Sequence, residues 1–197
     1  MKPLYNQYSY PKRFTISELR RFLAKDSDYD FIPYRIEDGS EEVKELSADF
    51  SRIRKWINDQ IVIRDIKYIV VHCTATRQDA KVSSIVNYWK NSLGWKNPGY
   101  HIIIKHSGEY SILKDLDHST NGVYGYNKNS IHISYIGGVD EDLKPLDNRT
   151  KEQKEILHFI VEELQKKFKA IVKGHRDFPN VKKACPSFDA IEEYKNL

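Results

Sequence analysis

The sequence predicts an α/β fold, in which a central mixed β-sheet of about five strands is flanked by helices and preceded by a mostly helical N-terminal extension. From residue 61 on, apolar β-rich runs alternate with segments of helical periodicity, which is typical of helices packed on the faces of a sheet. Two of these runs are joined by Lys105-His106-Ser107-Gly108, a hairpin turn that makes part of the sheet antiparallel. We therefore divide the chain into an extension, residues 1–60, and a main domain, residues 61–197.

The extension is expected to end in a long helix over residues 41–58. Its apolar side chains recur at spacings of three and four, which places them on one helical face: Val43, Leu46, Phe50, Ile53 and Ile57. Such a stripe is most simply a core contact, here covered by the main domain. Upstream, Thr15 and Glu18 have the spacing of a capping box at the start of a short helix. Residues 31–36 are expected to form a strand.

The main domain is predicted to run strand, helix, hairpin, strand, helix, strand, helix. The first strand covers residues 68–71 and ends at His72, since its apolar β-branched run is typical of a buried strand. Thr150 caps the longest helix, with Gln153 at the capping-box position. This helix ends near Phe168. The remaining elements are a helix over 83–92, strands over 99–105, 109–113 and 130–136, a short strand at 171–172, and a helix from about Asp189.

Composition excludes several classes of protein. Hydrophobic residues make up 40% and aromatic residues 12% of the 197 residues, so disorder over the whole chain is not expected. The net charge of +4 is a mild excess without a basic stripe, so we expect no nucleic-acid partner, although an anionic polymer would be weakly attracted. Two cysteines, Cys73 and Cys185, do not make a disulfide scaffold, which leaves one bridge, a metal site or a catalytic role open.

Neither a secretory signal nor a membrane span is predicted. Residues 1–11 are polar and rich in tyrosine, with no apolar stretch behind the first charges. The longest apolar runs, such as 68–71 and 102–104, are far shorter than the roughly 20 residues that a spanning helix needs. We therefore expect no membrane insertion.

Three residues could form a metal site. His72 ends a buried strand, His175 follows another, and Cys185 lies in a loop ten residues later. Imidazole and thiolate are good zinc ligands, and a catalytic zinc takes three protein ligands and leaves one position open. The spacing matches neither a zinc finger nor the H-E-x-x-H pattern, so spacing alone leaves structural histidines as an equally open interpretation.

Four segments in a fixed order give these residues a context. They are VHCTAT at 71–76, GW at 94–95 with GYHIII at 99–104, GYNKNSI at 125–131 with GG at 137–138, and KACPSFD at 183–189. Together they resemble the type 2, phage-lysozyme-like N-acetylmuramoyl-L-alanine amidases, a family related to peptidoglycan recognition proteins. The resemblance covers about residues 65–195.

The resemblance implies a zinc-dependent hydrolase of the amide bond between N-acetylmuramic acid and L-alanine in peptidoglycan. It implies one Zn²⁺ per chain, held by His72, His175 and Cys185, with Tyr100 and Lys183 as catalytic residues beside the metal. Cys73 is not a ligand in this family, and in a strand its side chain points away from that of His72. The resemblance further implies a monomeric phage or prophage lysis protein that stays in the cytoplasm until it is released to the cell wall.

The sequence departs from the family pattern at one position, and two alternative functions remain open. Related phage enzymes often carry a histidine three residues before the Gly-Tyr-Asn segment, where this chain has Gly122, and His118 lies four residues earlier. A non-catalytic recognition module is the first alternative, but such proteins typically lack the thiolate that Cys185 provides. A zinc hydrolase of another peptidoglycan amide is the second. The other buried or surface histidines are assigned no catalytic role: His101, His106, His132 and His158.

Overall fold

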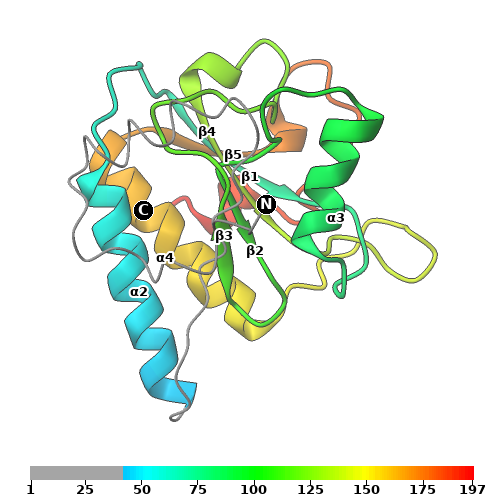
Figure 1. Ribbon diagram of the computed structural model, residues 1–197, viewed down its shortest axis with the longest axis horizontal. Coiled ribbons are helices and arrows are strands. Elements are labelled where there is room, and N and C mark those ends of the chain that lie inside the picture. The colour runs from blue at the N-terminus through cyan, green and yellow to red at the C-terminus, as the bar shows by residue number, and fades with distance from the viewer. Residues whose placement is uncertain (1–41) are drawn as a thin grey trace, which may run out of the picture.

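The structure, a computed structural model, describes residues 42–197, with side chains described from Phe50 on. Its centre is one five-stranded sheet in the order β3-β2-β4-β1-β5 (Figure 1). The predicted α/β fold with a mixed sheet of about five strands is thereby confirmed. The strands are β1 (Tyr68–Cys73), β2 (Ile102–Ile104), β3 (Tyr110–Ile112), β4 (Ser130–Tyr135) and β5 (Ile171–Gly174).

The strand directions bring several carboxyl ends to one edge of the sheet. β1 runs parallel to both β4 and β5, and β2 runs parallel to β4, whereas the hairpin partner β3 is antiparallel to β2. His72 lies opposite Ser134 of β4, close to the ends of both strands. In sheets of this kind, ligands bind beyond the carboxyl ends of the parallel strands.

Helices cover both faces of the sheet. α2 (Glu42–Asp59) and α4 (Lys151–Phe168) lie side by side on one face, and α3 (Val82–Asn87) lies on the other (Figure 1). α3 continues directly into a π-helical turn at Tyr88–Ser92, short 3₁₀ turns occupy Asn127–Asn129 and His175–Asp177, and α5 (Ala190–Glu193) ends the described fold.

The side chains of β1 alternate between these two faces. Ile69, Val71 and Cys73 belong to the main core with α4. Val70 contributes to a separate cluster on the opposite face, and His72 shares that face because strand side chains have a period of two. The candidate ligand is therefore separated from the main core by the sheet itself.

α4 begins and α2 ends with well-satisfied backbone groups. Thr150 accepts a hydrogen bond from the Gln153 amide while the Gln153 side chain accepts one from the Thr150 amide, so the predicted capping box is confirmed. At the other junction, the Lys167 ammonium donates to the carbonyls of Ile57, Asn58 and Gln60 at 2.6, 3.0 and 2.7 Å. The ammonium thereby supplies donors at the end of a helix, where the last carbonyls lack the donors of a following turn.

The predicted stripe of α2 is a core contact where its side chains are described. Ile53 and Ile57 have no exposed surface and share the main core with α4, and the Phe50 ring contacts that of Phe159 at a tilt of 37° with ring centroids 4.6 Å apart. The side chains of Val43 and Leu46 lie outside the described part, as do the short helix at Thr15 and the strand over 31–36. The division at residue 60 stays a prediction.

Element boundaries differ from the predicted ones by a few residues. The largest difference is β2, which was expected over 99–105 and covers Ile102–Ile104. Gly99 and Tyr100 leave the sheet because they pack against Trp89 of the π-helical turn. Among residues 42–197, no helix combines the length and the apolar character needed to cross a bilayer.

Candidate metal centre

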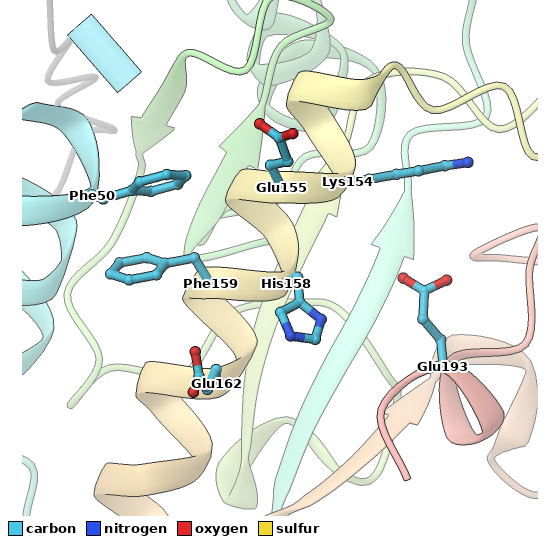
Figure 2. A pocket seen from close by; sticks show the side chains of 7 residues that line it. All are labelled: Phe50, Lys154, Glu155, His158, Phe159, Glu162 and Glu193. Carbon is cyan, nitrogen blue, oxygen red and sulfur yellow. The ribbon is translucent and has the colours of Figure 1, made fainter. Parts of the chain in front are cut away.

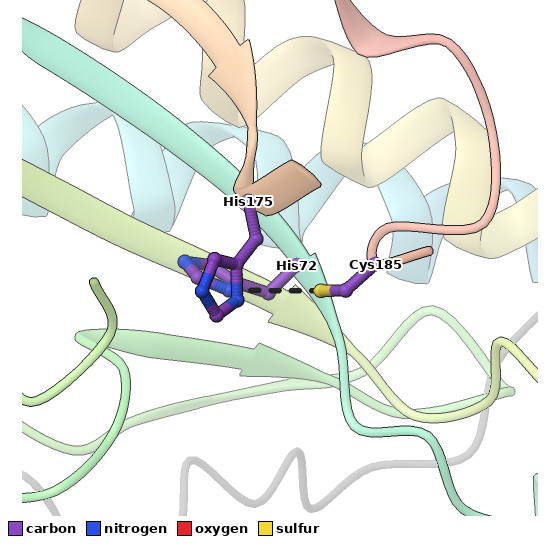
Figure 3. Close-up of side chains that lie close together, drawn as sticks. All are labelled: His72, His175 and Cys185. Carbon is purple, nitrogen blue, oxygen red and sulfur yellow. Dashed lines mark hydrogen bonds between the residues drawn. The ribbon is translucent and has the colours of Figure 1, made fainter. Parts of the chain in front are cut away.

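His72, His175 and Cys185 come together at the carboxyl ends of β1 and β5 (Figure 3). His72 is carried by β1, His175 follows β5 directly, and Cys185 comes from the loop before α5. Each offers one ligand atom, and the three atoms all lie within 4.8 Å of one another. The three residues predicted as metal ligands are thus adjacent, although 113 positions separate the first from the last.

The donor set and the spacing of Cys185 from His72 fit a tetrahedral zinc ion. Zn–S bonds of about 2.3 Å and Zn–N bonds of about 2.0–2.1 Å place the two donor atoms about 3.6 Å apart at a tetrahedral angle. The Cys185 Sγ atom lies 3.7 Å from Nδ1 of His72. With three protein ligands, a fourth position remains for water or substrate, as in catalytic zinc sites.

The protonation of the two histidines suits metal binding. Burial, and then the charges of His175 and Lys183, lowers the pKa of His72 well below its ordinary value. Burial and Lys183 lower the pKa of His175 to about 4. Both imidazoles are therefore neutral at pH 7 and have a lone pair available for a cation. Burial raises the pKa of the Cys185 thiol, so a divalent cation would be needed to hold it as the thiolate.

Tyr100 stands directly beside the first ligand. Its ring centroid is 4.9 Å from that of His72 and 5.2 Å from that of Trp89, and the Trp89 ring is nearly perpendicular to it at 82°. Trp89 can approach this closely because residue 99 is glycine, where a Cβ would lie 2.8 Å from Trp89 Cζ2. Burial raises the pKa of the Tyr100 hydroxyl, which therefore remains a hydrogen-bond donor at neutral pH.

Lys183 is exposed, yet its charge acts on all three candidate ligands. It lowers the pKa of His72, His175 and Cys185. Lys182, its neighbour in sequence, has no such effect on any of them. Tyr100 therefore lies next to the cluster, and Lys183 lies near enough for its charge to act on the three candidate ligands.

The loop that carries Cys185 is attached to the sheet by distant residues. The Tyr135 hydroxyl donates to the Pro186 carbonyl at 2.6 Å, and the Ser187 hydroxyl donates to the Gly138 carbonyl at 2.7 Å. The Cys185 sulfur also accepts a hydrogen bond from the Cys73 amide at 3.2 Å. The Cys73 side chain is buried in the main core, as expected for a residue on the face opposite His72.

Comparison with known proteins decides the family. The model of the N-acetylmuramoyl-L-alanine amidase family matches residues 63–188, well over half of the chain.

The chain belongs to the N-acetylmuramoyl-L-alanine amidase family.

Relatives of known name agree with this assignment. The endolysin of Enterobacteria phage K11 is 36% identical over 121 residues, which span 60% of this chain and 79% of the relative. The endolysin of Escherichia phage T7 is 35% identical over 123 residues, spanning 61% and 80%. A peptidoglycan-recognition protein of Drosophila melanogaster is 30% identical over 121 residues, spanning 56% and 63%. The chain is an N-acetylmuramoyl-L-alanine amidase, with peptidoglycan as its substrate or ligand.

Solved structures support the same fold. An endolysin N-acetylmuramoyl-L-alanine amidase from Clostridium intestinale superimposes with a TM-score of 0.56 at 22% identity, over 66% of this chain and 81% of that one. The bumblebee peptidoglycan recognition protein PGRP-SA gives a TM-score of 0.52 at 21% identity, over 69% and 84%. At these identities the likeness concerns the fold alone.

Sequence reasoning about the amidase missed one residue at the cluster. His132 of β4 has no exposed surface, and its Nδ1 lies 3.0 Å from Nε2 of His72. The strand pattern alone did not reveal this contact, because it depends on the register, in which His132 pairs with Val70 and so shares the face of His72. His118, the histidine four residues before Gly122, pairs its ring with Asp115 at 2.7 Å and is largely exposed.

A separate pocket of the amidase lies away from these residues. It has a volume of about 500 Å³ and lies along α4, between α2 and α5 (Figure 2). It includes neither a candidate ligand nor a predicted catalytic residue, and its lining consists of Phe50, Lys154, Glu155, His158, Phe159, Glu162 and Glu193. This pocket is therefore separate from the predicted metal cluster at the sheet edge.

Proposed function

We propose that this amidase is zinc-dependent and hydrolyses the amide between N-acetylmuramic acid and L-alanine, with one Zn²⁺ held by His72, His175 and Cys185. The supporting observation is that two neutral imidazoles and one thiol converge within 4.8 Å at the carboxyl ends of parallel strands. The thiol is the decisive member for the enzyme reading, because recognition proteins that bind without cutting typically lack it.

The chemistry needs a nucleophile and a site for negative charge. When bound, zinc lowers the pKa of a coordinated water to about 7 and polarises the carbonyl. When the activated water attacks the carbonyl carbon, negative charge builds up on the carbonyl oxygen. The Lys183 ammonium and the Tyr100 hydroxyl would donate hydrogen bonds to this oxygen. Such donors act most strongly in the transition state, and one of them is typically worth roughly 2.7–4 kcal/mol.

The proposed setting is lysis of the bacterial wall by a monomer. The phage relatives are named endolysins, which supports a protein that accumulates within the cell and reaches peptidoglycan once the membrane is opened. The net charge of +4 agrees with weak attraction to an anionic wall polymer.

The test combines metal content with the end groups released from purified peptidoglycan. We expect about one zinc per chain, new L-alanine amino termini and no new reducing sugar ends. Cys185→Ala should lose both zinc and activity. Cys73→Ala is the comparison variant: its thiol interacts with that of Cys185, but Cys73 is not a proposed ligand, so this variant should keep both.

Each other outcome identifies an alternative. New amino groups on residues other than L-alanine would indicate a hydrolase of the stem peptide. Binding to sedimented peptidoglycan without either product, by a folded and zinc-loaded sample, would indicate a recognition module. Full zinc content and activity in Cys185→Ala would refute the ligand assignment.

A further inference from the structure

The two ring nitrogens of His72 face different partners. Nδ1 lies 3.7 Å from the Cys185 sulfur, and Nε2 lies 3.0 Å from Nδ1 of His132. We propose that His132 is a positioning residue of the metal centre, which holds His72 in the orientation and tautomer that bind the metal. The inference rests on the proposed role of His72 as a ligand.

The hydrogen bond between the two rings has only one direction when a metal is bound. An imidazole coordinates through an unprotonated nitrogen, so a neutral His72 that offers Nδ1 carries its proton on Nε2. This Nε2–H donates to Nδ1 of His132, which must be the acceptor. Metal-binding histidines generally donate their second N–H to a carboxylate, a carbonyl or water, and this partner fixes the ring and its tautomer. Here an imidazole takes that place.

His132 is itself held in a defined position. Its amide donates to Nδ1 of His101 at 2.9 Å, and the His101 amide donates to the His132 carbonyl at 2.8 Å. The two rings stack at an interplanar angle of 20° with centroids 5.9 Å apart. Because Nδ1 of His101 accepts, its Nε2 carries the proton and donates to the His118 carbonyl at 2.9 Å, while the Arg64 guanidinium lies 3.1 Å from the same nitrogen. A buried histidine thus supports the histidine that supports His72.

A packing role alone does not explain an imidazole at position 132. The flanking residues of β4, Ile131 and Ile133, are fully buried and apolar. With Nδ1 used as the acceptor, the proton of His132 is on Nε2, and this atom has no hydrogen-bond partner among the described residues. An unpaired buried donor destabilises a fold, and an apolar side chain would avoid that cost. The acceptor at Nδ1 is what the histidine adds.

Gly122 gives an independent sign that the ring occupies a special place. A Cβ on residue 122 would lie 2.3 Å from Nδ1 and 2.4 Å from Cγ of His132. The His132 ring therefore fills the space that a side chain at residue 122 would need. This is the position where the resemblance leads one to expect a histidine, so the imidazole is supplied from β4 and the loop residue is reduced to glycine.

The test compares two variants of nearly equal shape in the full-length, zinc-loaded protein. In His132→Asn the amide oxygen can occupy the place of Nδ1 and accept from His72, whereas His132→Leu offers no acceptor. The dissociation constant for zinc is measured by competition with a chromophoric chelator. We expect His132→Leu to raise it by about 10–100-fold and His132→Asn to stay close to the unsubstituted protein. The melting temperature of the metal-free protein should be no lower for Leu than for Asn.

Gly122→Ala serves if His132→Leu does not fold, because it keeps every hydrogen-bonding group and only displaces the His132 ring. It should also weaken zinc binding. Equal zinc affinity for the Leu and Asn variants, or unchanged affinity in Gly122→Ala, would overturn the inference. If the unsubstituted protein binds zinc through Cys185 and these variants leave its affinity unchanged, only the inference fails. If Cys185→Ala binds zinc as tightly as the unsubstituted protein, the proposed function fails and the inference with it.

Discussion

Arg149 is the cation that the described fold buries most completely among carboxylates, and its removal gives a prediction of definite size. Its side chain is 2% exposed and donates to both oxygens of Asp147, at 2.8 and 2.9 Å, and to both oxygens of Glu193, at 2.8 and 2.7 Å. Its guanidinium carbon also lies 3.3 Å from the centre of the Phe188 ring, in the segment that follows Cys185. The side chain therefore joins the start of α4 to the C-terminal segment.

The expected cost of Arg149→Met is about 3 kcal/mol. Methionine keeps an apolar stem over Phe188 and removes the charge and its hydrogen bonds. Breaking a buried pair typically costs about 3–5 kcal/mol, because it leaves uncompensated charge. The side chains of Asp147 and Glu193 are 29% and 33% exposed, so water can partly solvate them and the lower figure applies. For a chain of this size, that corresponds to a fall in melting temperature of roughly 6–12 °C.

The pH dependence has a definite sign. Burial alone would raise the pKa of the Asp147 carboxyl, but hydrogen bonds and charge from Arg149 outweigh burial and lower it. The stabilisation is therefore complete above the unfolded pKa of about 4 and is lost as the pH falls through the lower folded value. The stability difference between the natural chain and Arg149→Met should shrink as the pH falls below 4.

The assay is thermal and urea unfolding followed by circular dichroism at pH 7 and at lower pH. Lys144→Met is the matched control, because Lys144 and its partner Asp142 are 73% and 75% exposed, and it should change stability by less than about 0.5 kcal/mol. A loss below 1 kcal/mol for Arg149→Met at pH 7, or a loss that does not depend on pH, would refute the reasoning.

Two further predictions concern the catalytic residues and the extension. Tyr100→Phe and Lys183→Ala should each lower kcat by about 10²–10³ with zinc content intact, and Lys182→Ala should be close to neutral; activity losses that follow zinc loss would argue against direct roles. Deleting residues 1–40 should leave a folded zinc protein, whereas deleting residues 1–60 removes Ile53 and Ile57, each worth about 1.5–3 kcal/mol of burial, and should lower the melting temperature. Loss of zinc binding in the shorter deletion would contradict this division, and calorimetry with metal analysis distinguishes the outcomes.

Much of the fold could be predicted because its elements have strong local signals. The β-branched run of β1 and the capping box of α4 each depend on residues that are close in sequence. The end of β2 could not be predicted in the same way. Gly99 and Tyr100 continue the apolar run, but they turn toward Trp89, which belongs to another segment, and hydrophobic periodicity carries no information about such a partner.

In the candidate site, too, some residues could be predicted from the sequence and others could not. The residue types of His72, His175 and Cys185 indicated a metal, and the family resemblance indicated which residues meet. The role of His132 could not be predicted from the sequence, because its contact with His72 depends on the register of β1 against β4. A shift of one residue would place His132 on the opposite face. Gly122 was visible as a departure, but its reason is the His132 ring, which no local pattern reveals.

The buried core of the fold extends beyond the segment of the chain that matches the family. The family match begins at residue 63, yet Ile53 and Ile57 have no exposed surface and belong to the same core as α4. The Lys167 ammonium joins α4 to the last carbonyls of α2 and the residue beyond it. These contacts lie on the face of the sheet opposite His72. The end of the extension can therefore contribute to stability without contacting His72, since the sheet separates the two.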